Sequence, residues 1–180
     1  MPEFIEVKNE EDIRALTALA SEIWYQYWVC LLDKAQISYM VEKFQSYNAV
    51  LKQIRDENYI YKFICLNGEN VGYYGICVKD KKVWQSDNAE IQPYLFLSKL
   101  YLKEQYRGKG LGRAAFEDIG KIAHAKNLDY IYLTVNKYNT NTVKAYAKWG
   151  FNKVESAVTS IGQGFVMDDY IMSYNSGVSK

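Results

Sequence analysis

The segment 107–113 reads RGKGLGR and runs directly into helix-forming sequence, and it limits the folds open to this chain more than any other feature. The first N–H groups of a helix lack internal partners and carry the positive end of the helix dipole, so they bind anions such as phosphate. Glycines at Gly108, Gly110 and Gly112 let an anion reach the backbone, and flanking cations add charge. A tight turn with one glycine at positive φ is the structural alternative. Three glycines with cations favour a phosphate site at a helix beginning near Gly110.

Two well-known phosphate-binding patterns fit the segment less well. A Walker loop requires G-x-x-x-x-G-K-[ST], and this order does not occur in the chain. Gly110, Gly112 and Ala115 satisfy the loose G-x-G-x-x-[GA] pattern of dinucleotide folds, which also needs an acidic residue about 20 positions later. The next predicted strand ends at Val135-Asn136-Lys137 and offers no such acid. A dinucleotide oxidoreductase therefore stays open only as a weaker alternative.

Length and composition favour one globular domain over residues 1–180, since the chain has 180 residues, of which 49% are hydrophobic and 24% charged. We find no apolar run of about 20 residues, and the acidic start is unlike a secretory signal, so we expect a cytoplasmic protein that does not bind membranes. A net charge of +1 gives no reason to expect a nucleic-acid partner. Cys30, Cys65 and Cys77 have no metal-site spacing, so we expect buried thiols, no disulfide framework and no metal.

Hydrophobic periodicity predicts an ordered series of strands and helices. A short strand at FIEVKN precedes two or three helices between Glu10 and about Asn58, and a β-hairpin then turns at Asn67-Gly68. Strands follow at PYLFLSKLYL, DYIYLTVN, FNKVESAVTS and FVMDDYIMSY, with a helix after the glycine segment and another at NTNTVKAYAKWG closed by Gly150. This order implies an α/β (α+β) fold with one mixed sheet and helices on both faces.

The strand before the glycines shows a change of phase. Leu95 and Leu97 stand at odd positions, whereas Leu100 and Leu102 stand at even ones. A β-bulge near Ser98 produces such a change and leaves backbone groups free for a ligand. A strand buried on both faces is the alternative.

These residues resemble the GNAT superfamily of acetyl-CoA-dependent N-acetyltransferases. The [QR]-x-x-G-x-[GA] signature reads Arg107-Gly-Lys-Gly110-Leu-Gly112, and the later run LTVNKYNTNTVKAYAKWGF is similar to the family's ending through Asn141, Tyr146, Gly150 and Phe151. Weaker similarity at ISYMVEKFQS and DDYIM extends to a bacterial branch of spermidine acetyltransferase-like proteins. The resemblance implies a single mixed, mostly antiparallel sheet of six or seven strands, with a bulge in the strand before the glycine loop.

The resemblance also implies a site for acetyl-CoA as co-substrate. The pantetheine arm would pair with the strand at Leu100, Tyr101 and Leu102, the pyrophosphate would rest on the glycine loop, and an amide at Asn141 would contact the cofactor. The full set of implied cofactor-binding residues is Leu100, Tyr101, Leu102, Arg107, Gly108, Lys109, Gly110, Leu111, Gly112, Arg113 and Asn141.

Tyr146 is the predicted catalytic residue, placed by the resemblance near the thioester sulfur. Aminolysis of a thioester releases a thiolate, and a phenol with a pKa near 10 can protonate a thiolate whose conjugate acid lies at about 8.5. Tyr146 is also one of 17 tyrosines, so packing on a helix face is the ordinary alternative.

The general base is the point where the chain departs from the family pattern. Many relatives place a glutamate at or near Ser98, but this stretch reads Leu97-Ser98-Lys99. Ser98 can instead order a water, the amine can arrive neutral, or an acid from elsewhere can reach the site. The acids considered are Asp87, Glu90, Asp168 and Asp169, and none is assigned. His124 shares a helical face with charged neighbours and is expected to be a solvated bystander.

The acceptor site is defined less well. Trp24 and Trp28 lie one helical turn apart, flanked by tyrosines, where the family often builds its acceptor wall, and with Ser98 they form the predicted substrate-binding set. Core packing is the alternative, whereas an exposed aromatic wall could bind an amine through cation–π contacts.

We therefore expect an enzyme that transfers an acetyl group to a primary amine by direct attack in a ternary complex. The acceptor can be a small amine, a polyamine or a protein amino group. A catalytically silent module that binds or senses acetyl-CoA is the alternative, since the usual glutamate is missing. A homodimer is an option that the resemblance leaves open.

Overall fold

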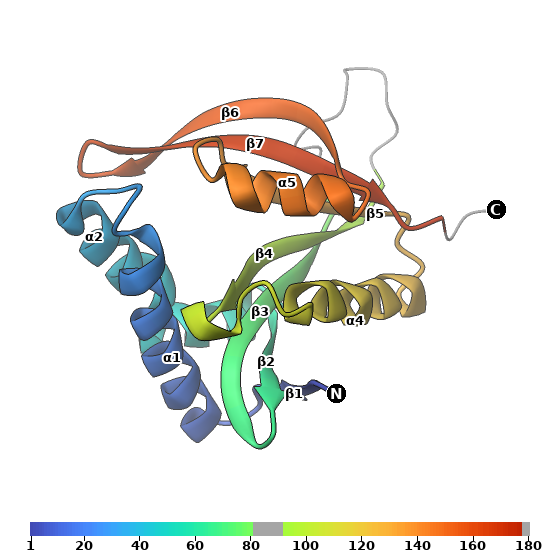
Figure 1. Ribbon diagram of the computed structural model, residues 1–180, viewed down its shortest axis with the longest axis horizontal. Helices are drawn as coiled ribbons and strands as arrows, with labels where there is room; N and C mark the ends of the chain where they lie inside the picture. The colour runs from blue at the N-terminus through green and yellow to red at the C-terminus, as the bar shows by residue number, and fades with distance from the viewer. Residues whose placement is uncertain (81–91, 178–180) are drawn as a thin grey trace. The chain divides into compact units, whose positions relative to one another are not determined.

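The computed structural model describes residues 1–80 and 92–177, and its elements follow the predicted order (Figure 1). The elements are β1 (Glu3–Glu6), α1 (Glu10–Trp28), α2 (Lys34–Gln45), α3 (Tyr47–Asp56), β2 (Ile60–Leu66), β3 (Glu69–Lys79), β4 (Tyr94–Leu102), the 3-10 turn η1 (Glu104–Tyr106), α4 (Leu111–Ala125), β5 (Tyr130–Asn136), α5 (Thr140–Lys148), β6 (Asn152–Gly162) and β7 (Phe165–Asn175). The helix-rich segment before β2 thus contains three helices, and α4 begins one residue after Gly110, as predicted.

The strands form one sheet of seven in the order β1-β2-β3-β4-β5-β7-β6. Pairing of β4 with β5 is parallel, whereas β1 with β2, β2 with β3, β5 with β7 and β6 with β7 are antiparallel. This confirms the predicted mixed, mostly antiparallel sheet. The chain divides into two compact units, of which the first combines residues 1–77 and 98–118 and the second combines 78–97 and 119–180. The prediction of one domain over residues 1–180 stays a prediction.

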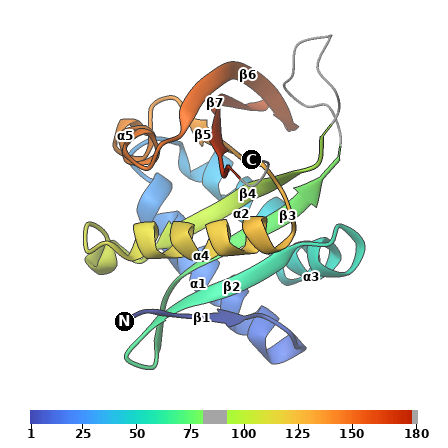
Figure 2. The same cartoon turned by 90° about the vertical axis from the view of Figure 1, so that its right-hand side faces the viewer.

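In the first unit, helices cover both faces of the strands. Tyr61 of β2 and Tyr73 of β3 are buried in the core cluster that α1 helps to form. Their neighbours Lys62 and Tyr74 point the other way, because side chains alternate along a strand. On that side Asp118 of α4 accepts hydrogen bonds from Lys62 Nζ at 3.0 Å and from the Tyr74 hydroxyl at 2.5 Å. Figure 2 shows α4 in front of these strands and α1 behind them.

The turn between β2 and β3 has the predicted chemistry. Asn67 has φ 53° and Gly68 has φ 79°, so both central residues adopt the left-handed conformation. Two such residues form the type I′ turn, whose twist matches that of the paired strands. The Asn67-Gly68 pair therefore explains why β2 and β3 form a hairpin.

The second unit is built on β5, β7 and β6. The register of β5 with β7 runs from Tyr130 opposite Asn175 to Asn136 opposite Asp169. Ile131, Leu133 and Val135 are all buried, which confirms the predicted apolar face of β5.

Gly150 closes α5 with φ 99°, as predicted. A Cβ atom there would approach the Tyr174 ring to 3.2 Å, so glycine serves both the turn and the packing.

Burial along β4 alternates from Leu95 to Lys99, and no change of phase occurs within that stretch. Leu95 and Leu97 are buried, and the next buried position is the charged Lys99, at 6% exposure, rather than Leu100 or Leu102, which are only partly buried. The leucine pattern misled because a lysine occupies an inward position. The register with β5 covers Leu95–Leu97 and the bulge itself stays a prediction.

The cysteines differ from expectation at one position. Cys65 and Cys77 are buried thiols, but Cys30 is exposed. The prediction was wrong for Cys30 because α1 ends at Trp28 and Cys30 lies in the connection to α2, outside the buried helical face.

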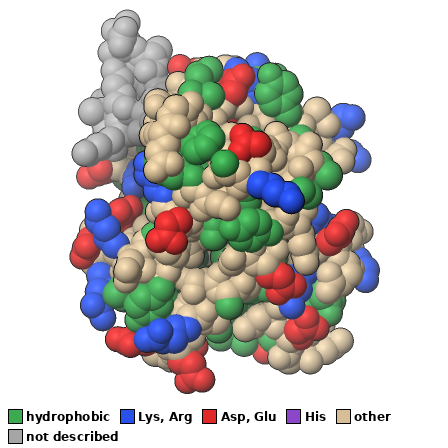
Figure 3. Space-filling model, turned by 90° about the vertical axis from the view of Figure 1, so that its left-hand side faces the viewer, with side chains coloured by type: hydrophobic (Ala, Val, Ile, Leu, Met, Phe, Trp, Pro, Cys, Tyr) green, Lys and Arg blue, Asp and Glu red, His purple; other side chains and the backbone are tan. Residues whose placement is uncertain are grey.

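On the face shown in Figure 3, acidic and basic side chains are interspersed.

Candidate active site

The glycine loop of the first unit leads into an open helix N-terminus. Gly108 has φ 73° and Gly110 has φ 81°, and a Cβ atom on either would meet nothing within 4 Å. The N–H of Ala114 donates to the Gly110 carbonyl at 3.0 Å, which is the first hydrogen bond of α4. The N–H groups of Leu111, Gly112 and Arg113 precede that bond and have no acceptor within the helix. The turn therefore needs positive φ at these two positions, as the structural alternative expects, and phosphate binding at the helix end stays a prediction.

Each of the three predicted cations of the loop contacts a neighbouring residue. Arg107 Nε donates to the Leu102 carbonyl at 3.0 Å, and its guanidinium lies 4.6 Å from the centre of the Tyr27 ring. Its Nη2 is buried and has no hydrogen-bond partner among the residues that the structure describes. Arg113 pairs with Glu117 at 3.0 Å along the helix, and the exposed Lys109 has its Nζ 5.6 Å from the centre of the Tyr106 ring. Arg107 thus braces the loop and retains one unused donor.

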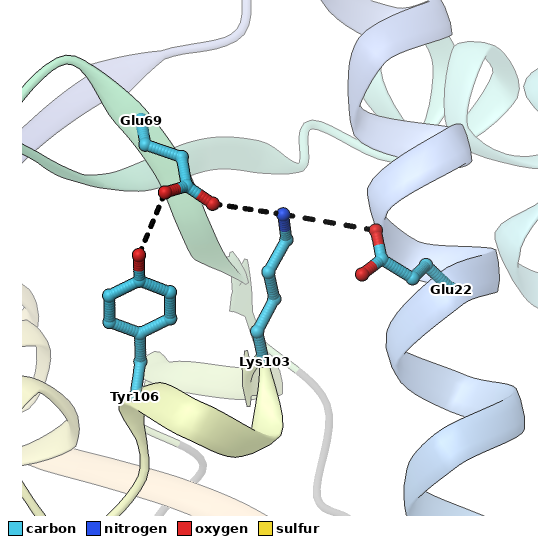
Figure 4. A network of polar contacts seen from close by, with 4 residues as sticks. All are labelled: Glu22, Glu69, Lys103 and Tyr106. Atoms are coloured by element: carbon cyan, nitrogen blue, oxygen red, sulfur yellow. Dashed lines mark hydrogen bonds and ion pairs between the residues drawn. The ribbon is translucent and has the colours of Figure 1, made fainter.

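A polar network fixes the turn that precedes the loop (Figure 4). Glu69 of β3 accepts from Lys103 Nζ at 3.1 Å and from the Tyr106 hydroxyl at 2.7 Å. Lys103 Nζ also lies 3.9 Å from Glu22 of α1. The hydrogen bonds from Tyr106 and Lys103 lower the pKa of Glu69. Strand β3, helix α1 and turn η1 are therefore tied together immediately before Arg107.

The predicted pantetheine strand, Leu100–Leu102, is partly buried. It lies close to β3, since a Cβ atom on Gly72 would come within 2.4 Å of the Tyr101 carbonyl oxygen. Gly72 is therefore required for the approach of β3 to this part of β4.

Trp24 and Trp28 lie inside the first unit, each with 4% of its surface exposed. Trp24 Nε1 donates to the Tyr73 hydroxyl at 3.1 Å, and the Trp24 ring lies 5.4 Å from that of Tyr101. The Trp28 ring lies 5.8 Å from the Trp24 ring. These contacts match the core-packing alternative, and an acceptor-binding role for the two tryptophans stays a prediction.

Lys99, next to Ser98, was not singled out from the sequence. Its Nζ donates to Gln53 Oε1 at 3.0 Å and to the Tyr61 hydroxyl, and it lies 5.4 Å from the centre of the Tyr59 ring. Burial lowers the pKa of Lys99 to about 7, although Cys77 and Glu57 act in the opposite direction. The inward parity of positions 95, 97 and 99 was the signal that could have found it.

Ser98 is partly buried, and its side chain is hydrogen-bonded to Tyr59. Burial raises the pKa of Tyr59, so this phenol does not ionise readily. Asp87 and Glu90, two of the acids considered as bases, lie outside the described residues. His124 is exposed at the end of α4, as expected for a solvated side chain.

The second unit contains Asn141 and Tyr146 on α5. Asn141 is exposed in the first turn of the helix, and Tyr146 is buried at 7% exposure. The Tyr146 ring lies 5.3 Å from the Trp149 ring and 5.5 Å from the Phe151 ring, both edge-on. The packing role is therefore present, and the catalytic role stays a prediction.

The two acids of β7 have different surroundings. Asp168 forms an ion pair with Lys137, whose backbone N–H also donates to the Asp168 carbonyl at 3.0 Å. Asp169 lies opposite Asn136 in β5 and Ala157 in β6. Burial, followed by the charge of Asp168, raises the pKa of Asp169 to about 6, and Lys137 offsets part of this.

Within residues 1–80 and 92–177, no three or more His, Cys, Asp or Glu side chains gather in a way that could hold a metal ion. No helix in the same part of the chain is long and apolar enough to cross a membrane.

Comparison with known proteins decides the family. The family model described as "Acetyltransferase (GNAT) family" matches residues 16–151, which is more than half of the chain. The chain belongs to this family. It is thus an acetyl-CoA-dependent N-acetyltransferase, and the oxidoreductase alternative falls away.

Individual relatives are distant but cover most of the chain. The uncharacterized N-acetyltransferase in the pepI 3'region of Lactobacillus delbrueckii subsp. lactis is 22% identical over 155 residues, covering 86% of this chain and 87% of that protein. The structure of the PaiA N-acetyltransferase of Thermoplasma acidophilum in complex with coenzyme A has a TM-score of 0.73 at 20% identity, covering 97% of this chain and 99% of that one. A GCN5-related N-acetyltransferase of Rhodopseudomonas palustris has a TM-score of 0.74 at 15% identity, covering 97% and 96%. These structures establish the GNAT fold.

Proposed function

We propose that the enzyme acetylates a primary amine by direct attack of the amine on acetyl-CoA in a ternary complex. The pyrophosphate of the co-substrate binds the loop Arg107–Gly112, with Arg113 nearby, and the pantetheine arm pairs with Leu100–Leu102. Asn141 contacts the co-substrate, and Tyr146 donates a proton to the departing thiolate.

The open N-terminus of α4 carries this proposal. Three consecutive N–H groups, from Leu111 to Arg113, precede the first hydrogen bond of the helix, and the adjacent Gly108 and Gly110 add no side chains. A phosphate group suits such a helix end, because backbone donors and the helix dipole act together. The unused Nη2 of Arg107 supplies a further donor in the same unit.

The acceptor is a primary amine of one of three kinds: a small amine, a polyamine or a protein amino group. The weak similarity at ISYMVEKFQS and DDYIM supports the polyamine branch, while the near-neutral net charge of +1 gives no added attraction for a polycation. These two observations therefore favour none of the three acceptor classes over the others.

An assay of thiol release from acetyl-CoA over an amine panel tests the function. The panel contains spermidine, simple monoamines and peptides with free N-terminal or lysine amines, and mass spectrometry identifies the acetylated product. Initial rates with both substrates varied should give intersecting lines, as expected for a ternary complex, whereas parallel lines would indicate a covalent acetyl-enzyme. Absence of acetylated product with every acceptor class, in a protein that binds acetyl-CoA, would refute transfer to these amines.

A further inference from the structure

We propose that the carboxylate of Asp169 accepts the proton of the acceptor ammonium and so takes the place of the glutamate missing at Ser98. The inference rests on the proposed function. It names the general base for the same reaction, which neither the family match nor the resemblance assigns.

The position of Asp169 follows from the strand register of the second unit. Residues directly opposite in antiparallel strands carry their side chains on the same face. Asp169 therefore shares a face with Asn136 of β5 and Ala157 of β6. Ile171, two residues along β7, lies on that face too and is packed with Tyr94 and Tyr132.

The side chains beside Asp169 form an aromatic cluster whose centre is buried and whose margin is only partly buried. The cluster of Tyr94, Tyr132 and Ile171 is extended by Phe96, Tyr130 and Ala157, and Ala157 is the residue opposite Asp169. Phe96 of β4 belongs to this cluster and to the same compact unit as Asp169. Aromatic faces attract ammonium groups, and a carboxylate at their margin supplies the counter-charge.

Asp169 is not neutralised in the way that Asp168 is. The Oδ1 atoms of both acids are buried and without a hydrogen bond in the described part of the chain, although the Asp169 side chain as a whole keeps some exposure. What separates the two acids is the ion pair of Asp168 with Lys137. Asp169 forms no ion pair within residues 1–80 and 92–177, so it is the acid with which an incoming ammonium would pair.

The charges around Asp169 come from three strands. Asp168 lies beside it on β7 and Lys137 follows β5, and on β6 Glu155 stands opposite Ile171. Lys153 Nζ lies over the Tyr170 ring at 3.9 Å. Burial and Asp168 raise the pKa of Asp169, Lys137 lowers it, and the value is about 6. Such a carboxyl is ionised at neutral pH and still basic enough to accept a proton.

The proposed transfer balances without any further reactant. Asp169 takes one proton from the ammonium, and the neutral amine nitrogen forms a bond to the thioester carbonyl carbon. The carbon–sulfur bond then breaks, and the thiolate takes a proton from Tyr146. The nitrogen then loses its second proton, and this proton reaches the Tyr146 phenolate through solvent and restores the phenol. Asp169 releases the proton that it accepted to water. The products are the N-acetylated amine, coenzyme A and one proton.

Asp169→Asn tests the role, with Asp168→Asn as a matched control at the next residue. Asp169→Asn should lower kcat/KM for the amine by about 100-fold or more, with acetyl-CoA affinity by calorimetry unchanged. The acidic limb of the wild-type pH profile, with an apparent pKa near 6, should disappear. Asp168→Asn should retain the limb but move it to lower pH, because the charge that raises the pKa of Asp169 is removed and Lys137 is released.

Two further readouts separate base catalysis from a merely structural effect. The deficit of Asp169→Asn should shrink with acceptors of low amine pKa, which are already neutral at the assay pH. Asp169→Glu should restore the acidic limb at a reduced rate.

If the wild type acetylates an amine and Asp169→Asn does so at the same rate with the same pH profile, the inference is overturned and the proposed function stands. If the wild type acetylates no amine, both are overturned.

Discussion

The buried amine of Lys99 leads to a prediction that does not depend on catalysis. Burial lowers its pKa to about 7 from an ordinary value of 10.5. Between these two pH values the unfolded chain holds a proton that the folded chain has lost, so the free energy of unfolding rises with pH. Each pH unit in this interval contributes at most about 1.4 kcal/mol. The penalty for burying the lysine is thus full below pH 7 and disappears as the pH approaches 10.5.

Replacing Lys99 with methionine should remove this dependence. The hydroxyl of Tyr61 donates to Gln53 Oε1 at 2.5 Å, so these two groups keep each other as partners when the amine is gone. Wild type should gain at most about 3 kcal/mol relative to Lys99→Met between pH 7.5 and 9.5. Burial also raises the pKa of Tyr59 and of Tyr61, and their contribution begins only at higher pH, which sets the upper limit of the interval.

Urea unfolding monitored by circular dichroism at several pH values measures the difference. Lys52→Met, which removes an exposed lysine from α3, controls for the loss of one positive charge. Lys99→Arg keeps a permanent charge and should be destabilised throughout the interval. A wild-type minus Lys99→Met difference that stays constant from pH 7.5 to 9.5 would refute the account of Lys99 as an amine neutralised by burial.

Three further predictions concern the proposed site. Tyr146→Phe should lower kcat about 100-fold or more while the KM for acetyl-CoA stays the same, and steady-state kinetics that leave kcat unchanged would exclude the phenol as proton donor. Gly110→Ala should lose about 1–2 kcal/mol of stability from its φ of 81° and weaken acetyl-CoA binding by calorimetry. Its control Gly120→Ala, inside α4, should gain up to about 1 kcal/mol, and equal effects at both positions would contradict the assigned turn geometry. Glu69→Gln should weaken acetyl-CoA binding by less than about fivefold, because the exposed contact with Tyr106 helps to position the loop. The difference in affinity between Glu69→Gln and the wild type should disappear at high salt, which screens the Glu69 charge.

The order of elements could be predicted because local signals agreed with the tertiary structure. Periodicity alone correctly predicted the buried face of β5, which consists of Ile131, Leu133 and Val135. The need for positive φ correctly predicted the Asn67-Gly68 turn and the end of α5 at Gly150. The turn at Gly108 and Gly110 could also be predicted, since the positive φ of the loop and its proposed ligand both require glycine there.

Features that depend on distant partners could not be predicted. The apolar pattern of β4 suggested a change of phase because a lysine was not expected to face inward, and Lys99 is accommodated by Gln53 from α3 and by Tyr61 from β2. Likewise, the sequence could not separate Asp168 from Asp169, because only the ion pair of Asp168 with Lys137 distinguishes them. Contacts between β7 and the segment after β5, rather than local pattern, determine which acid pairs with Lys137.

The position of Cys30 between α1 and α2 has a practical consequence. Cys65 and Cys77 are buried, so alkylating reagents should modify the native protein at one thiol. A fluorophore could then be attached at the end of α1 without mutagenesis. The same thiol will react with a disulfide reagent used to detect released coenzyme A, so alkylation of Cys30 before the assay removes one equivalent of background per chain.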